Sequence, residues 1–157
     1  MDGHALHLMV NHFPVILSLL GLAATIVAFI TRKRSVLLYA LATLTLAGAS
    51  SYPAFFTGDE AKEQIDKRWY VDRDQLHEHE EAAEFANVLL IVTGVVAGAA
   101  WWRTVRTVRE LSPSVPLLAV LLVLSMACAA SVARVSWLGG FIAIKNPLLI
   151  NSVAPPK

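Results

Sequence analysis

The sequence has 157 residues, of which 56% are hydrophobic and only 16% are charged. This composition is too apolar for an ordinary soluble domain, and it predicts one small integral membrane domain over residues 1–157. The formal net charge is +1. The basic residues lie in short blocks and many of the acidic residues lie in one connection, without the basic face that binds nucleic acid. The single cysteine, Cys128, excludes an internal disulfide bond and any metal site built from several thiolates.

Four apolar segments are each long enough to cross a bilayer as a helix, which takes about 20 residues. They run over residues 8–31, 36–56, 82–102 and 115–144. Helices are expected rather than strands, because backbone polar groups inside a bilayer must be paired within their own segment. The first segment is expected to be retained rather than cleaved, since its basic residues follow it instead of preceding it. The predicted fold class is therefore all-α, a four-helix transmembrane bundle with an acidic connection at residues 57–81.

The basic residues predict the orientation in the membrane. The connections after the first and third segments carry three basic residues each, namely Arg32, Lys33, Arg34, Arg103, Arg106 and Arg109. The residues before the first segment include no Lys or Arg, and the connection at residues 57–81 is rich in acids. Because short flanks rich in Lys and Arg remain in the cytoplasm, we expect both termini and the acidic connection to lie outside it.

Small residues indicate where the helices pack. Gly94 and Gly98 lie four residues apart in the third segment, a spacing that allows another helix to approach closely. Residues 47–51 and 127–131 provide similar small-residue stretches in the second and fourth segments. A compact bundle is expected.

Residues 76–81, at the entrance to the third segment, combine two histidines with three glutamates. All five histidines of the chain fall on the same side of the predicted membrane: His4, His7, His12, His77 and His79. His12 lies inside an apolar segment, where a polar side chain needs a partner, either a ligand or an ordinary hydrogen bond. His79 is expected to face the bundle and His77 the solvent, because residues two apart cannot share a helix face. Since the first and third helices of an up-down bundle are diagonal, His12 and His79 are expected to face each other.

Arg134 lies about 28 Å along the fourth segment from Val115, at 1.5 Å per residue, and therefore near the outer membrane boundary. Two interpretations are open. The side chain either extends to water on its own, or it pairs with an acidic group inside the bundle. The candidate partners are Asp59, Glu63, Glu80 and an anionic group of a cofactor.

A series of short motifs extends over nearly the whole chain. They are His7-Leu8, Asn11-His12-Phe13-Pro14, the stretch Pro53-Ala54-Phe55-Phe56-Thr57-Gly58-Asp59-Glu60-Ala61-Lys62-Glu63, His79-Glu80-Glu81-Ala82-Ala83 and Leu138-Gly139-Gly140-Phe141-Ile142. In this order, they resemble the motifs of a family of small bacterial four-helix membrane proteins. The resemblance implies the same fold, a bacterial inner-membrane location and association with redox modules such as Rieske or cytochrome c domains. The family's closing histidine and acid are replaced here by Ile144 and Asn146, which leaves His12 and His79 as the better pair.

Three functions are compatible with the sequence. The first is a membrane subunit of a respiratory or photosynthetic redox system. It would hold a b-type haem between the first and third helices, with axial ligands His12 and His79 and with Arg134 near a propionate. The second is a divalent metal site, because mixed imidazole and carboxylate ligands suit zinc or iron. Its ligands would be His12, His79, Asp59 and Glu80. The third is a cofactor-free structural subunit of a larger membrane complex.

Catalysis by this chain alone is not expected, because no nucleophile lies beside a base. The expected partners are the lipid bilayer and other membrane or periplasmic redox proteins, and not nucleic acid.

Overall fold

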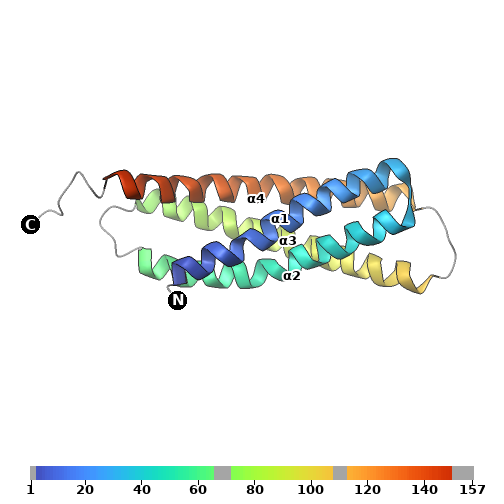
Figure 1. The fold of residues 1–157 in the computed structure, drawn as a ribbon, viewed down its shortest axis with the longest axis horizontal. Helices are drawn as coiled ribbons and strands as arrows, with labels where there is room; N and C mark the ends of the chain where they lie inside the picture. Colours follow the sequence, from blue (N-terminus) through green and yellow to red (C-terminus); the bar gives the residue numbers. More distant parts are fainter. Residues whose placement is uncertain (1–2, 66–71, 108–112, 150–157) are drawn as a thin grey trace, which may run out of the picture.

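The computed structural model describes residues 3–65, 72–107 and 113–149, and these form four long helices (Figure 1). The helices are α1 (Gly3–Thr31), α2 (Arg34–Ile65), α3 (Arg73–Arg106) and α4 (Val115–Leu149). No strand occurs in these three ranges. Each helix is long and apolar enough to span a bilayer. The predicted all-α, four-helix fold is confirmed.

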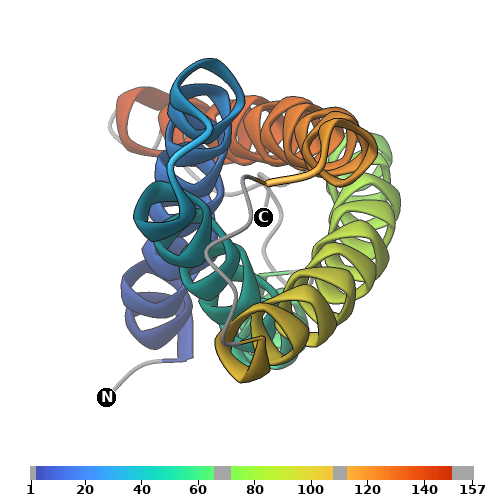
Figure 2. The ribbon, with the colours of Figure 1, turned by 90° about the vertical axis from the view of Figure 1, so that its right-hand side faces the viewer.

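The helices form a closed ring in chain order, as the view along the bundle shows (Figure 2). α1 packs on α2, α2 on α3 and α3 on α4, and α4 completes the ring against α1. α1 and α3 are therefore diagonal, as predicted. Short connections join the helices in an up-and-down arrangement.

α2 and α3 are longer than the apolar segments predicted inside them. They have 32 and 34 residues, or about 48 and 51 Å, whereas the hydrocarbon core is about 30 Å thick. The extra turns lie mostly at one end of the bundle, so most of the predicted acidic connection is helical. Asp72 caps α3, because its Oδ1 accepts hydrogen bonds from the backbone N–H groups of Asp74 at 3.1 Å and Gln75 at 3.4 Å. We call residues 57–65 and 72–81 the acidic end.

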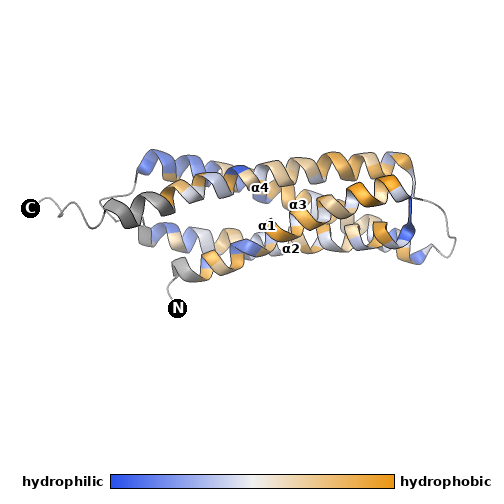
Figure 3. Cartoon of the chain, turned by 45° about the horizontal axis from the view of Figure 1, so that its top comes forward, coloured by the Kyte–Doolittle hydropathy of each residue, from blue (hydrophilic) through white to orange (hydrophobic). Residues whose placement is uncertain are grey.

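The opposite end of the bundle, residues 31–36 and 103–107, is the basic end. Figure 3 shows hydrophilic residues mainly toward the two ends, with an apolar band between them. At the basic end, Arg34 joins the start of α2 to the end of α3. Its Nη2 donates to the carbonyl oxygens of Thr104 at 2.6 Å and Thr107 at 3.1 Å. These carbonyls lack partners within the helix, so the guanidinium caps α3.

Large apolar side chains cover the outside of the bundle. Examples from each helix are Ile30, Phe56, Val95 and Val123, all more than half exposed. Such a continuous apolar exterior marks a surface made for a partner or a membrane rather than water. Together with the lengths of the helices, it is what a multi-pass membrane protein presents to lipid.

The interior is built from leucines toward the basic end and from small residues near the middle. The leucine-rich cluster comprises Ala28, Leu37, Leu41, Leu44, Ala97, Leu118 and Leu121. Further along, α2 and α3 touch backbone to backbone at Gly48 and Gly94. A Cβ atom placed on Gly48 would lie 2.8 Å from the Cα of Gly94. The close approach predicted for Gly94 is confirmed, whereas a Cβ on Gly98 would meet Thr45 only at an ordinary 3.5 Å.

Candidate functional site at the acidic end

His79 lies at the centre of the buried face of α3. The buried residues of that helix are Leu76, Ala82, Ala86, Leu90, Thr93, Gly94 and Ala97. At 3.6 residues per turn, all of them fall within about 60° of residue 79 around the helix axis. The ring of His79 packs over Gly139 of α4, where a Cβ atom would lie 3.1 Å from its Cε1. The prediction that His79 faces the bundle and His77 the solvent is confirmed.

His7 occupies the corresponding place on α1. It aligns with the buried residues Pro14, Ser18, Gly21, Thr25 and Ala28, which recur every three, four or seven residues along the same helix face. Its ring packs over Gly58 of α2, where a Cβ atom would lie 3.2 Å from Cε1. The ligand prediction had not included His7, although the spacing of these small and polar residues in the sequence was the signal that could have found it.

The polar contacts of His7 determine how its ring is protonated. Nδ1 lies 3.1 Å from the carbonyl oxygen of Ala54 and 3.3 Å from Oγ1 of Thr57, both on α2. Because a carbonyl oxygen can only accept, Nδ1 carries the proton and donates it. In the neutral ring the lone pair is then on Nε2.

His79 lies three residues before the segment at 82–102 that the sequence predicts to cross the membrane. Burial lowers the pKa of His79 and His7 lowers it further, while the backbone of Val135 and the carboxylate of Glu80 act in the opposite direction. Nδ1 of His79 is buried and has no hydrogen-bond partner within the part of the chain that the structure describes. His79 is therefore a neutral imidazole at pH 7, with His7 close enough to oppose its protonation.

His12 is on a different side of α1. Residue 12 is about 140° around the helix from residue 7, and its side chain is exposed. Its Nδ1 hydrogen-bonds the carbonyl oxygen of Leu8, one turn earlier in the same helix. The imidazole of α1 that faces the bundle is thus His7 rather than His12, because the buried face of the helix follows the small residues.

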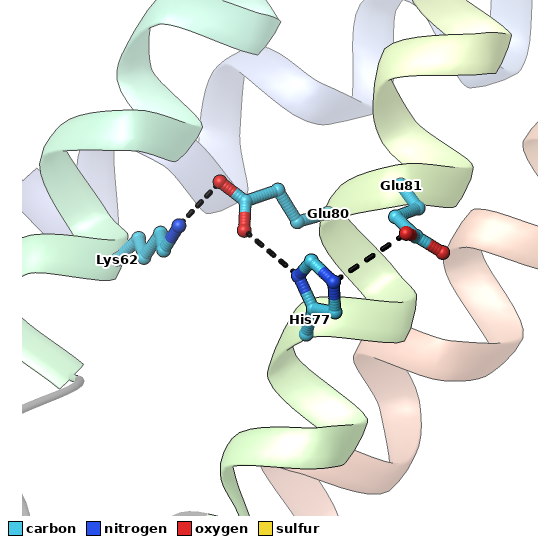
Figure 4. Close-up of polar contacts among 4 residues, drawn as sticks. All are labelled: Lys62, His77, Glu80 and Glu81. Atoms are coloured by element: carbon cyan, nitrogen blue, oxygen red, sulfur yellow. Dashed lines mark hydrogen bonds and ion pairs between the residues drawn. The ribbon is translucent and has the colours of Figure 1, made fainter.

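Glu80 is part of an ion pair between helices rather than a ligand set. It pairs with Lys62 of α2, and its Oε2 lies 3.8 Å from Nδ1 of His77 (Figure 4). The hydrogen bond from Lys62 lowers the pKa of Glu80, which lies in the polar extension of α3. On the other side of the same imidazole, Nε2 lies 3.4 Å from Oε1 of Glu81.

The four predicted metal ligands do not come together. Asp59 and His12 are exposed, and Glu80 is paired with Lys62. Among the residues that the structure describes, no group of three or more His, Cys, Asp or Glu side chains is placed to hold a metal ion. A divalent metal site needs several such side chains on one centre, so the structure gives this prediction no support.

Arg134 has a partner that the sequence interpretation did not consider. Its Nη2 lies 3.6 Å from Oε1 of Glu78, and its side chain is 65% exposed. The contact joins α4 to the neighbouring α3 on the outside of the bundle. Arg134 therefore extends toward solvent, as one of the two interpretations expected, and also forms an ion pair.

Four residues, one from each helix, form what we call the histidine–glycine cluster: His7, Gly58, His79 and Gly139. No family model, curated protein or solved structure matches the chain. The chemistry of the cluster is that of two imidazoles held by diagonal helices at one end of the bundle. Such a pair is suited to binding a metal centre that takes one ligand from each side.

Proposed function

We propose that this protein is a small membrane subunit that transfers electrons and holds one b-type haem at the acidic end, where His7 and His79 would bind its iron. The observation that carries the proposal is the arrangement of the histidine–glycine cluster. Two imidazoles come from diagonal helices near the acidic end of the bundle, and each lies over a glycine of the next helix. A b-type haem would be held by two imidazoles, and diagonal helices of a bundle supply one each.

The hydrogen bonding of His7 supports this role. Histidines that ligate metals usually donate their other ring N–H to a carbonyl or similar acceptor, which fixes the tautomer and the ring orientation. His7 does so toward Ala54, and the lone pair of its neutral ring is on Nε2. His79 contributes a buried Nδ1 without a hydrogen-bond partner in the described residues.

The donor set also favours haem over a bare divalent ion. Zinc takes three or four ligands from the protein, whereas the cluster has two imidazoles and Glu80 is paired with Lys62. The porphyrin supplies the other ligands of a haem iron. When bound, the haem supplies one-electron chemistry, and the protein holds and orients it. Arg134 has no role in this site, since it pairs with Glu78 on the exterior.

We place the protein in the bacterial inner membrane, with both termini and the acidic end outside the cytoplasm, as part of a respiratory or photosynthetic redox system. The basic residues at positions 31–36 and 103–106 support this orientation, and the redox partners are those that the resemblance of the sequence motifs implies. Alkaline phosphatase fused to the C-terminus is then active in a bacterial host, and green fluorescent protein fused there is dark. The reverse pattern would invert the proposed orientation.

The absorbance spectrum of the purified protein, oxidised and then reduced with dithionite, tests the haem. We expect the sharp reduced α-band of six-coordinate b-type haem, and we expect His7→Ala and His79→Ala each to abolish it. His12→Ala and His77→Ala are matched controls, because they remove exposed histidines from the same two helices and should keep the band. Circular dichroism verifies that each variant is folded.

A conservative replacement separates ligation from a structural role. His79→Met keeps a ligand for haem iron, so the band should persist with a higher midpoint potential. A featureless spectrum of the haem-supplied wild-type protein refutes the proposal. Loss of the band in His12→Ala but not in His7→Ala would instead favour the pair predicted from the sequence.

One observation favours a cofactor-free structural subunit as the second candidate. Each ring already packs over a glycine, where a Cβ atom would lie 3.2 Å from Cε1 of His7 or 3.1 Å from Cε1 of His79, and His7 is hydrogen-bonded to α2. In this form the histidines join helices in pairs without any ligand. A protein without haem whose thermal stability falls in His7→Ala, but not in His12→Ala, would support this alternative.

A further inference from the structure

A shallow groove of about 450 Å³ opens between α3 and α4 on the outside of the bundle. It is lined by Glu81, Ala82, Phe85, Ala130, Ser131 and Arg134. Ala82 is 20 residues from Trp102, or about 30 Å along the helix, which is the thickness of the hydrocarbon core. The groove therefore begins where the headgroups of a surrounding bilayer end.

The groove carries one cation and one anion on opposite walls. Arg134 is 65% exposed and Glu81 is 69% exposed, so both charges are accessible. A guanidinium has five N–H donors, and the 3.6 Å contact with Glu78 is longer than a hydrogen bond. Arg134 can therefore bind a phosphate through two parallel hydrogen bonds, with the hydroxyl of Ser131 beside it.

From the groove toward the middle of the bundle, the same faces of α3 and α4 carry exposed apolar side chains. Val88 on α3 and Met126 and Val123 on α4 follow the lining residues at helical spacing, and each is more than half exposed. A charged pocket above an apolar track matches the shape of a phospholipid, with its headgroup outward and its acyl chains along the helices.

We infer that this groove binds one phosphatidylethanolamine molecule, with its phosphate on Arg134 and Ser131 and its ammonium group on Glu81. The inference rests on the membrane location and not on the haem. A primary ammonium donates hydrogen bonds to a carboxylate, whereas the quaternary ammonium of phosphatidylcholine cannot. Glu78 and Glu81 outnumber Arg134, so an anionic lipid such as phosphatidylglycerol meets net repulsion.

Native mass spectrometry of the full-length protein tests the inference. The protein is reconstituted in nanodiscs that contain equal amounts of phosphatidylethanolamine, phosphatidylcholine and phosphatidylglycerol, and the lipids retained after release are identified. We expect one phosphatidylethanolamine to be retained preferentially. Arg134→Ala should lower that retention about tenfold, the effect of losing a charge-assisted hydrogen bond. Glu81→Gln should remove the preference over phosphatidylcholine.

Arg103→Ala and Glu84→Gln are the matched controls, because each removes an exposed charge of the same kind from α3 outside the groove. Both should retain phosphatidylethanolamine as the wild-type protein does. The inference is overturned if phosphatidylcholine or phosphatidylglycerol is retained equally well, or if no lipid is retained. It is also overturned if Arg134→Ala and Glu81→Gln behave like the controls, or if a second copy of the chain replaces the lipid.

Discussion

A methyl group added at Gly48 has no room, because α2 and α3 are in backbone contact there. Its Cβ atom would lie 2.7 Å from the carbonyl oxygen of Leu90 and 2.8 Å from the Cα of Gly94. Carbon atoms in contact rest about 3.5–4.0 Å apart, so the two helices must separate by roughly 1 Å. Neither contact is the end of a flexible side chain, so the strain cannot be relieved by a change of rotamer. Overpacking of this kind costs about 1–3 kcal/mol.

Gly98→Ala supplies the control that isolates this steric cost. Replacing glycine by alanine within a helix is favourable by about 1 kcal/mol, and this gain is common to both variants. At Gly98 the new Cβ meets only Thr45, at 3.5 Å. We therefore expect Gly48→Ala to be less stable than Gly98→Ala by about 1–3 kcal/mol in reversible unfolding in mixed micelles, followed by circular dichroism. Equal stability of the two variants would refute the backbone contact.

Two further perturbations test the contacts at the ends of the bundle. Lys62 lowers the pKa of Glu80 in the folded protein. Their ion pair thus stabilises the fold above the ordinary carboxyl pKa, and this contribution is lost as pH falls through the folded pKa. Lys62→Met should lower stability at pH 7 by less than about 1 kcal/mol, since both side chains are partly exposed. The melting temperatures of variant and wild type should converge as pH falls below the folded-state pKa of Glu80, and a difference that does not shrink as pH falls would contradict the assignment. At the basic end, Arg34→Ala should lower the free energy of unfolding by about 1–3 kcal/mol, because two carbonyl oxygens of α3 lose a charged donor. Arg34→Lys should lose less of the free energy of unfolding than Arg34→Ala but should not match the wild type, because an ammonium group cannot reproduce the two parallel N–H donors of a guanidinium. Denaturant titration measures the free energy of unfolding of both variants. An unchanged value for Arg34→Ala would contradict the role of Arg34 as a cap of α3.

The sequence alone was sufficient for the number of helices and their order in the ring. Length and continuous apolarity allow only helices in a bilayer, and four helices with short connections pack up and down in chain order. The sequence also predicted that His79 faces the bundle and His77 faces the solvent, because residues two apart on a helix face different directions. The lengths of α2 and α3 were underestimated. Hydropathy finds the part of a helix that crosses lipid and not the polar turns that continue beyond it.

Only the tertiary structure decided which histidine of α1 faces the bundle, where Gly94 meets its partner and which acid pairs with Arg134. The physical reason is that lipid is as apolar as the protein interior. A transmembrane helix is hydrophobic all round, so its hydropathy does not reveal the side on which it packs. The packing of small residues determines that side, and it turns His7 toward the centre of the bundle and His12 away from it.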